Sequence, residues 1–205
     1  KAMLRYPRFR FRPSQADALH LDFWLEGRNL LRDAGTYSYN TEARWLSYFP
    51  GTQSHNTVEF DGRDQMPRLS RFLFGNWLKT NVFRALSDSP DEQTITAGYK
   101  DGKHAQHIRS VSLRKGLLCV IDEVTGFKEK AVLRWRLEPG DWQFSEDVLS
   151  NANHTIRVMA DIPFKRYELV EGWESRYYHD KQPVPVLEVE VHQPGMLTTE
   201  YRWVS

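Results

Sequence analysis

The stretch QADALHLDFWLEGRNLLRDAGTYSYN, residues 15–40, decides the fold. From residue 15 to residue 25 its side chains alternate between two sets, which is the period-two pattern of a β-strand with two distinct faces. The glycine and the asparagine within residues 26–29 tolerate positive φ, so a tight reversal is predicted there. Residues 30–39 then predict an antiparallel partner strand.

A third strand is predicted at His55–Phe60, inside the segment FPGTQSHNTVEFDGRDQ of residues 49–65. Three neighbouring strands would bring more acids, bases and potential ligands together than any other part of the sequence offers. These side chains are Gln15, Asp17, His20, Asp33, Tyr37, Tyr39, His55 and Asn56.

The rest of the chain predicts a series of short strands separated by turn signals. Patterns with the period of a helix are almost absent. The chain has 205 residues, of which 13% are aromatic, a composition that favours strands. We therefore predict an all-β fold: one large antiparallel β-sandwich of stacked sheets, formed by residues 1–205 as a single domain.

Composition excludes several classes of function. A net charge of +1 gives no global signal for nucleic acid, and no Walker or dinucleotide motif is present. The single cysteine, Cys119, excludes an intrachain disulfide and is expected to be a small buried residue. No apolar run is long enough for a membrane span. Because the first residue is not Met, we expect the chain to be a fragment.

The N-terminal segment RYPRFRFR, residues 5–12, alternates cations with aromatic side chains. Such a segment is either an edge strand whose cations prevent mispairing or a contact strip for a polyanion. Arg10 and Arg12 are accordingly candidates for binding an acidic substrate, and Trp24 is a candidate aromatic platform for a sugar ring.

Three motifs in the first third of the chain resemble the heparinase II/III-like family of polysaccharide lyases. They are the aspartate strand at residues 17–22, the D-x-G-T-Y-x-Y motif at residues 33–39, and H-N-T-V at residues 55–58, followed by D-G and Q. The resemblance implies that the chain is the C-terminal β-sandwich domain of such a lyase. In these lyases the domain packs on an N-terminal α/α toroid, which this sequence lacks.

The resemblance also implies β-elimination on a uronic-acid polysaccharide, in which a base removes the C5 proton and an acid protonates the leaving oxygen. The family draws its tyrosine base from the toroid, and the sandwich adds a histidine. Pro13 occupies the place of that histidine here, and proline transfers no proton. His20 and Tyr39 are the remaining candidates for proton transfer, with a structural role as the alternative for each.

For metal binding, the resemblance implies that Gln15, Asp33 and His55 gather around one divalent ion. Zinc accepts histidine and aspartate, whereas calcium or manganese tolerates the oxygens, and we expect the ion to be structural. Read from the residues alone, His55 is equally a hydrogen-bonded core histidine, Asp33 a turn-capping residue and Gln15 a hydrogen-bonding strand residue.

The leading hypothesis is thus a lyase domain that acts on an acidic polysaccharide and is inactive without its toroid. The alternatives are a non-catalytic carbohydrate-binding module and a purely structural β module. A periplasmic or extracellular location in a bacterium is expected for the lyase.

Overall fold

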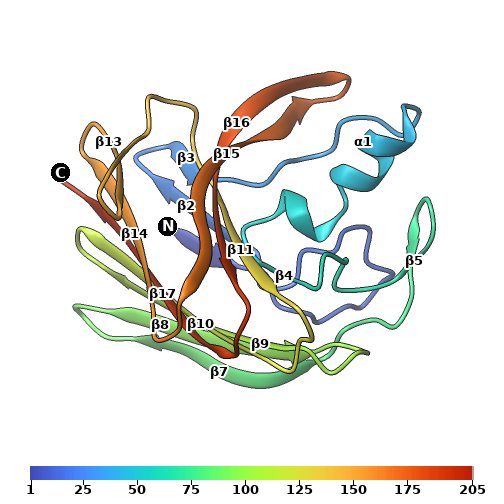
Figure 1. Ribbon diagram of the computed structural model, residues 1–205, viewed down its shortest axis with the longest axis horizontal. Helices are drawn as coiled ribbons and strands as arrows, with labels where there is room; N and C mark the ends of the chain where they lie inside the picture. Colours follow the sequence, from blue (N-terminus) through green and yellow to red (C-terminus); the bar gives the residue numbers. More distant parts are fainter. Residues whose placement is uncertain (205) are drawn as a thin grey trace.

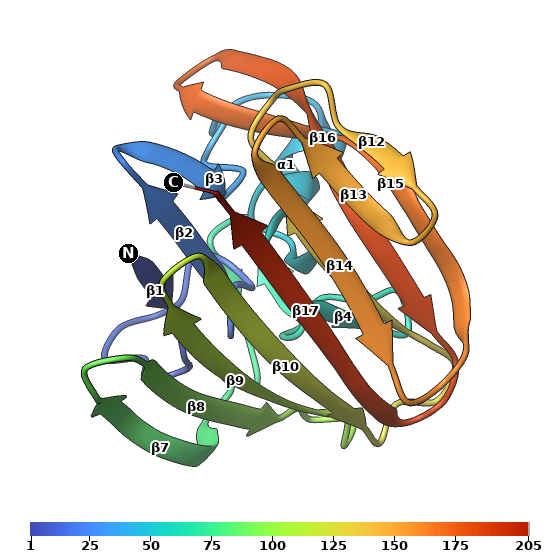
Figure 2. The ribbon, with the colours of Figure 1, turned by 90° about the vertical axis from the view of Figure 1, so that its left-hand side faces the viewer.

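The computed structural model describes residues 1–204, with Asp88 described by its backbone only. Within these residues the chain is built almost entirely from strands that pair antiparallel, and two large sheets pack face to face (Figures 1 and 2). The predicted all-β sandwich is confirmed. No helix within the described residues is long and apolar enough to cross a membrane.

The larger sheet has eight strands, which form the broad twisted surface in Figure 2. In spatial order they are β12 (Gln143–Ser145), β13 (Val148–Asn151), β14 (His154–Ala160), β17 (Gly195–Trp203), β10 (Leu117–Thr125), β9 (Gln106–Arg114), β8 (Gln93–Lys100) and β7 (Thr80–Asp88). The second sheet has four strands: β15 (Phe164–Tyr177), β16 (Asp180–Val191), β11 (Ala131–Arg136) and β4 (Val58–Phe60).

Smaller elements close the edges of the sandwich. A three-stranded sheet contains β1 (Ala2–Leu4), β2 (Leu21–Leu25) and β3 (Arg28–Leu31), and a hairpin contains β5 (Arg68–Ser70) and β6 (Leu73–Phe74). One α-helix, α1 (Ala43–Tyr48), and a 3₁₀ turn, η1 (Thr52–Ser54), lie between β3 and β4. Helix α1 lies on the side of the four-stranded sheet that faces away from the larger sheet (Figure 1).

The core lies between the two large sheets. Along β10, residues 118, 120, 122 and 124 are buried while residues 119, 121 and 123 are more exposed, as the two-residue period of a strand requires; the apolar members of the buried set are Leu118, Val120 and Val124. These side chains share one apolar cluster with Trp135 of β11 and Leu187 of β16. Burial of this continuous apolar surface is the main force that holds the two sheets together.

The prediction of a strand over residues 15–25 is wrong in its first half. Leu19 has a φ of 60°, and the His20 amide donates to the Asp17 carbonyl at 3.0 Å, so the chain turns there and β2 begins only at Leu21. The predicted reversal after β2 is confirmed, with Gly27 at a φ of 81° between the paired strands β2 and β3.

The remaining predictions for this region fail because of how its strands pair. Strand β3 ends at Leu31 instead of running to residue 39. Strand β4 begins at Val58 and pairs with β11 in the four-stranded sheet, so it is not a neighbour of β3. Residues 43–48 form α1, whose Trp45 packs on Trp173 of β15, although the sequence predicted no helix here.

Candidate functional site

Asn56 joins the segments that carry the candidate ligands. Its side-chain amide donates to the carbonyls of Leu21 and Arg32 at 2.9 and 3.2 Å, and its side-chain oxygen accepts from the Arg136 amide at 2.6 Å. The buried side chain therefore holds the start of β2, the end of β3 and strand β11 in one place. As a result, the loops around residues 20, 33 and 55 meet.

At this meeting point lie His20, Asp33 and His55, which we call the histidine–aspartate centre. One potential ligand atom from each residue lies within 4.8 Å of the others. Oδ2 of Asp33 is 3.3 Å from Nδ1 of His55 and 3.7 Å from Nε2 of His20, and both histidine side chains have an exposed fraction of 0%. Among the described residues, neither ring nitrogen of His55 has a hydrogen-bond partner.

The two histidines differ in the state of their rings. The backbone amide of Asn56 donates to Nδ1 of His20 at 2.9 Å, so Nδ1 holds a lone pair and Nε2 of the neutral ring carries the hydrogen. This N–H lies 3.4 Å from Oδ2 of Asp22. His20 is therefore placed as a donor toward carboxylates, whereas both nitrogens of His55 are free to act as ligands.

The guanidinium of Arg5, itself a cation, also contacts the centre. Its Nη1 donates to Asp17 at 2.9 Å and to Oδ2 of Asp33 at 3.1 Å, and its Nη2 lies 3.6 Å from Asp22. No local sequence pattern predicts these ion pairs. Arg5 is about one-third exposed, with 38% of its side chain accessible, and it closes the centre on the side of the N-terminal segment.

The donor set of the centre could hold a divalent cation. Burial alone would raise the pKa of Asp33, but the neighbouring His55 and His20 rings and the Gly35 amide hold that pKa well below its usual range, so the carboxylate is ionised. A buried imidazole without a partner costs free energy. A metal ion that took its lone pair from His55 and a carboxylate oxygen from Asp33 would remove this cost.

Arg109 of β9 supports the centre from the larger sheet. It is fully buried, and it donates to both oxygens of Asp122 from Nε and Nη2 at 2.6 and 3.0 Å. Its Nη1 donates to the carbonyls of Leu19 and Asn56 at 2.6 Å each. These carbonyls directly precede His20 and follow His55 in the chain, so one guanidinium fixes the backbone beside both histidines.

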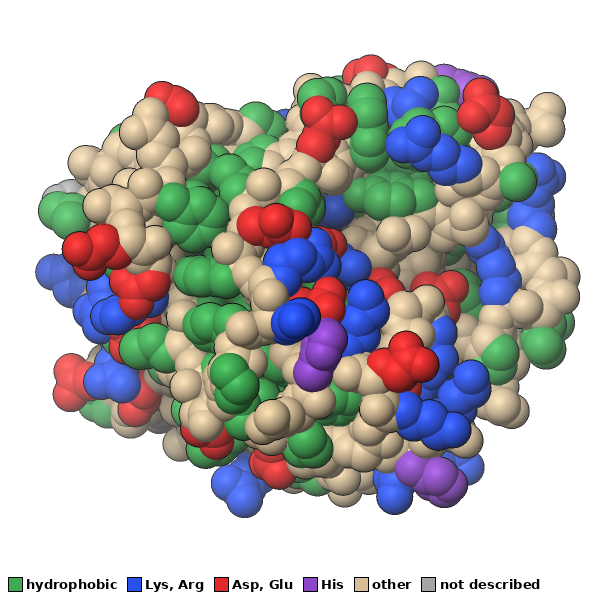
Figure 3. All heavy atoms as spheres, viewed as in Figure 1, with side chains coloured by type: hydrophobic (Ala, Val, Ile, Leu, Met, Phe, Trp, Pro, Cys, Tyr) green, Lys and Arg blue, Asp and Glu red, His purple; other side chains and the backbone are tan. Residues whose placement is uncertain are grey.

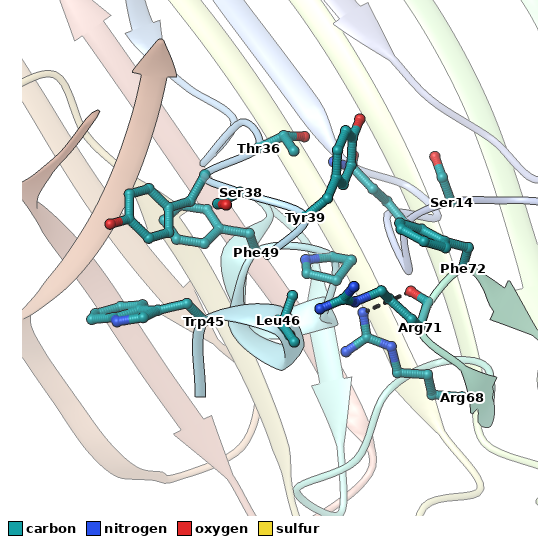
Figure 4. Close-up of a pocket in the computed structure, with 13 residues that line it drawn as sticks. Ser14, Thr36, Ser38, Tyr39, Trp45, Leu46, Phe49, Arg68, Arg71 and Phe72 are labelled. Atoms are coloured by element: carbon teal, nitrogen blue, oxygen red, sulfur yellow. Dashed lines mark hydrogen bonds between the residues drawn. The ribbon is translucent and has the colours of Figure 1, made fainter. Parts of the chain in front are cut away.

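A pocket begins where the loop from Asp33 continues to residue 39. It lies between α1 and the β5–β6 hairpin, and we call it the aromatic–arginine pocket (Figure 4). It encloses about 100 Å³, or about 530 Å³ with its open mouth. It is lined by Ser14, Gln15, Thr36, Tyr37, Ser38, Tyr39, Trp45, Leu46, Phe49, Pro50, Arg68, Arg71 and Phe72.

Comparison with known proteins identifies the family. The family described as heparinase II/III-like, C-terminal, matches residues 6–204, which is nearly the whole chain. This chain belongs to the heparinase II/III-like C-terminal family. The resemblance seen in the sequence motifs is confirmed. No curated protein sequence gives a significant match.

Solved structures share the fold of this heparinase II/III-like domain. A structure described as the heparinase III-BT4657 gene product superposes with a TM-score of 0.81 at 19% identity, over 99% of this chain and 32% of that one. A heparan sulfate lyase, HepC from Pedobacter heparinus, gives a TM-score of 0.71 at 18% identity, over 93% of this chain and 31% of that one. The chain thus spans about a third of the length of these proteins.

In this heparinase II/III-like domain, the candidate site residues predicted from the sequence lie in different places. Asp33 and His55 come together as predicted, and His20 is the third member of their cluster. Gln15 is half-buried and lines the aromatic–arginine pocket, as does Tyr39, whose exposed fraction is 55%. The predicted ligand role of Gln15 stays a prediction.

The three candidates for substrate binding lie elsewhere. Arg10 and Arg12 are exposed in the N-terminal segment, and Trp24 of β2 has an exposed fraction of 39%. None of the three lines the aromatic–arginine pocket. Their roles stay predictions.

Sequence reasoning missed four arginines: Arg5, Arg68, Arg71 and Arg109. For Arg109 a signal existed, because His107, Arg109 and Val111 share one face of a strand, and Val111 marks that face as buried. For Arg5, nothing in the local sequence indicates its partners Asp17 and Asp33. For Arg68 and Arg71, nothing in the local sequence indicates that they line a pocket with Tyr39.

Proposed function

We propose that this chain is the β-sandwich domain of a polysaccharide lyase that cleaves a uronic-acid-containing acidic polysaccharide by β-elimination. The observation that carries the proposal is the family match over residues 6–204. Likeness in fold to a heparan sulfate lyase supports it. On this proposal the polymer and the N-terminal α/α toroid of the parent chain are the partners of the domain, and a periplasmic or extracellular location in a bacterium gives access to such a polymer.

The two candidates for proton transfer, His20 and Tyr39, differ in their exposure to solvent. A general acid or base must come within hydrogen-bond reach of the substrate. The His20 side chain is fully buried, whereas Tyr39 is exposed at a pocket. We therefore assign any proton transfer by this domain to Tyr39 and a supporting role to His20. The base that abstracts the C5 proton would come from the toroid, so the isolated domain is expected to be inactive.

A single divalent cation at the histidine–aspartate centre is part of the proposal. Asp33 and His55 would hold it, and Gln15 remains the third ligand that the resemblance implies. A histidine nitrogen favours zinc or manganese over calcium, which prefers a shell of oxygens. The ion would act structurally, because both histidines are buried and the centre ties together loops that flank two different sheets.

The test of the lyase proposal is turnover by the full-length parent protein. The parent is incubated with heparan sulfate, hyaluronan and alginate, and the ultraviolet absorbance of the unsaturated uronate product is followed. Product from at least one polymer, with none from residues 1–205 alone, supports the proposal. The absence of product from every uronic-acid polymer would overturn it.

The aromatic–arginine pocket also favours a second candidate function, a carbohydrate-binding module without chemistry of its own. This alternative predicts that residues 1–205 bind an oligosaccharide while Tyr39→Phe leaves turnover by the parent unchanged. A loss of turnover without a loss of binding in this variant would instead place Tyr39 in the chemistry.

A further inference from the structure

We propose that the aromatic–arginine pocket binds one negatively charged sugar unit, with Arg68 and Arg71 holding its anionic group and Tyr39 and Phe72 packing against its ring. The choice of a sugar as ligand rests on the proposed function, whereas the preference for an anion rests on the geometry alone. The enclosed part of the pocket has room for a carboxylate or sulfate group, and the ring would lie in the open mouth.

The charges of the pocket favour an anion. Its lining contains two arginines and no aspartate or glutamate. Within residues 1–204, neither Arg68 nor Arg71 forms an ion pair. Nη2 of Arg68 donates to the Arg71 carbonyl at 3.4 Å, and Nε of Arg68 is buried without a hydrogen-bond partner. Guanidinium groups bind carboxylate and sulfate oxygens through paired N–H donors, and among the described residues no hydrogen-bond acceptor engages the Arg71 guanidinium.

The arrangement of the pocket directs these donors inward. Both arginines reach into the space between α1 and the β5–β6 hairpin, opposite Leu46 (Figure 4). On the molecular face in Figure 3, by contrast, cationic and anionic side chains are mixed, and the net charge of the chain is only +1. An anion would therefore be held by this pocket and not by a general positive field.

Exposed aromatic rings form one rim of the pocket. The Tyr39 ring lies 5.5 Å from Phe72 and 5.7 Å from Tyr178, and the exposed fractions of these three side chains are 55%, 47% and 53%. A group of large exposed aromatic rings marks a binding surface. The C–H face of a sugar ring packs on such rings, so the rim suits the uncharged part of a sugar.

The rim is also held in place and is electropositive. The Tyr39 amide donates to the Tyr178 hydroxyl at 3.0 Å, which fixes the loop after Asp33 against the end of β15. Hydrogen bonds from Ser38 and from the Tyr39 amide, together with the charge of Arg71, lower the pKa of Tyr178. The charge of Arg71, which lines the pocket, would likewise favour an anionic ligand over an uncharged one.

The experiment titrates residues 1–205 with short oligosaccharides and follows the fluorescence of the protein, since Trp45 lines the pocket. One ligand carries a uronate, a second carries the uronate and a sulfate, and a third is the carboxyl-reduced, unsulfated analogue. We expect both anionic ligands to bind at least tenfold more tightly than the uncharged one, and the stronger of the two identifies the anion. Equal binding of all three would overturn the inference.

The variants separate the pocket from non-specific charge. Arg71→Ala and Arg68→Ala are each expected to weaken binding of the anionic ligands about tenfold, as the loss of a charge-assisted contact predicts. Arg84→Ala, on exposed β7, removes the same charge and should leave binding unchanged. An equal loss in Arg84→Ala and Arg71→Ala would overturn the inference. Thermal melts of each variant show whether the fold is retained.

Failure of this inference and failure of the proposed lyase function give different results. If the domain binds the anionic sugar while the full-length parent releases no unsaturated product, the pocket stands and the lyase function fails. If the parent turns over but Arg68→Ala and Arg71→Ala leave both binding and the Michaelis constant unchanged, the lyase function stands and the pocket fails.

Discussion

The backbone amide of Asn56 donates to Nδ1 of His20 at 2.9 Å, and this bond makes the two histidines of the centre chemically different. Nε2 of the neutral His20 ring must carry a hydrogen, so it faces the carboxylates of Asp22 and Asp33 as a donor. His55 has no such constraint, because both its ring nitrogens lack partners within the described residues. At the proposed metal site, His55 would therefore be the ligand and His20 would support Asp33.

This difference predicts unequal effects on metal binding. We expect His55→Gln to weaken zinc binding by a hundredfold or more, and His20→Gln to weaken it by about tenfold, the lower end of the scale for residues that support a ligand. Equilibrium dialysis of the chain against zinc measures both. His192→Gln, on a partly exposed histidine, is the matched control. If His20→Gln costs as much as His55→Gln, then His20 coordinates the ion directly.

Arg5 contacts Oδ2 of Asp33 at 3.1 Å, so it would compete with the proposed metal ion for that oxygen. Arg5→Gln should therefore tighten zinc binding about fivefold, corresponding to about 1 kcal/mol for a partly exposed cation. The same change should lower the unfolding free energy in the absence of metal, because Asp17 and Asp33 lose their partner. Calorimetric titration and urea unfolding measure the two effects. Weaker zinc binding in Arg5→Gln would show that Arg5 assists the ion.

Arg109 provides a stability prediction. Arg109→Met leaves Asp122 as an uncompensated buried charge and leaves the Leu19 and Asn56 carbonyls without their donor. The expected loss in unfolding free energy is about 3–5 kcal/mol, measured by urea unfolding. Arg157→Met, which removes an exposed ion pair with Asp147, should cost less than about 1 kcal/mol.

A second variant keeps the Arg109 prediction testable if the first fails to fold. In Arg109→Met with Asp122→Leu, the unpaired charge is gone, and part of the lost stability should return. If the double variant is no more stable than Arg109→Met alone, the cost comes from the two backbone carbonyls and not from the charge of Asp122.

The sequence predicted the sandwich because burial on one face of a strand forces a two-residue period, as in β10. It failed at residues 15–20, where the same alternation continues through a turn. Leu19 adopts a positive φ in that turn because the chain must reach the Arg5 carbonyl, to which the Leu19 amide donates at 2.7 Å. That partner lies in a different segment, so no local pattern reveals it.

Asp33 and His55 of the centre lie close together, although the strand arrangement predicted for them is wrong. Asp33 and His55 were expected on neighbouring strands, yet they lie in loops beside β3 and β4, which belong to different sheets. The link is Asn56, whose side chain joins those loops through backbone groups. Motif resemblance grouped Asp33 with His55, which the structure brings together, whereas Gln15, the third residue of that grouping, stays a prediction. The arginines of the pocket were missed because pairing of β5 with β6 places them near Tyr39 only in three dimensions.

The buried His107–Asp122 pair predicts how stability depends on pH. Burial is the main cause that lowers the pKa of His107 below its ordinary value of 6.5, so the folded protein keeps this ring neutral. Below pH 6.5 the unfolded chain binds a proton that the folded chain excludes, and stability falls as pH falls. Burial opposes ionisation of Asp122, but Arg109 and His107 lower the pKa of Asp122 to about 2, so a second loss begins below pH 3.8.

Urea unfolding between pH 7 and pH 5 tests the histidine. In His107→Gln, the decline in unfolding free energy should be smaller than in the unchanged chain, by up to about 1.4 kcal/mol per pH unit for one proton. His192→Gln should keep the original decline. An unchanged slope in His107→Gln would mean that other groups cause the acid sensitivity in this range.

Gly35 predicts a strong effect of one methyl group on both the fold and the centre. It has a φ of 76°, forms a bridge with Ser175, and donates its amide to Oδ1 of Asp33 at 2.7 Å. A Cβ here would collide with the Ser175 carbonyl oxygen, which is backbone and cannot move aside easily. Gly35→Ala should therefore cost more than about 3 kcal/mol of unfolding free energy and weaken zinc binding, since Asp33 would shift.

Gly27 is the matched control for this change. Its φ is 81°, but no atom lies within 4 Å of the position that a Cβ would take. Gly27→Ala should therefore cost only the backbone strain, about 1–2 kcal/mol, and should leave zinc binding unchanged. Urea unfolding and equilibrium dialysis of the two variants give the comparison. Equal losses of stability in both would show that positive φ alone, and not the contact with Ser175, requires glycine at residue 35.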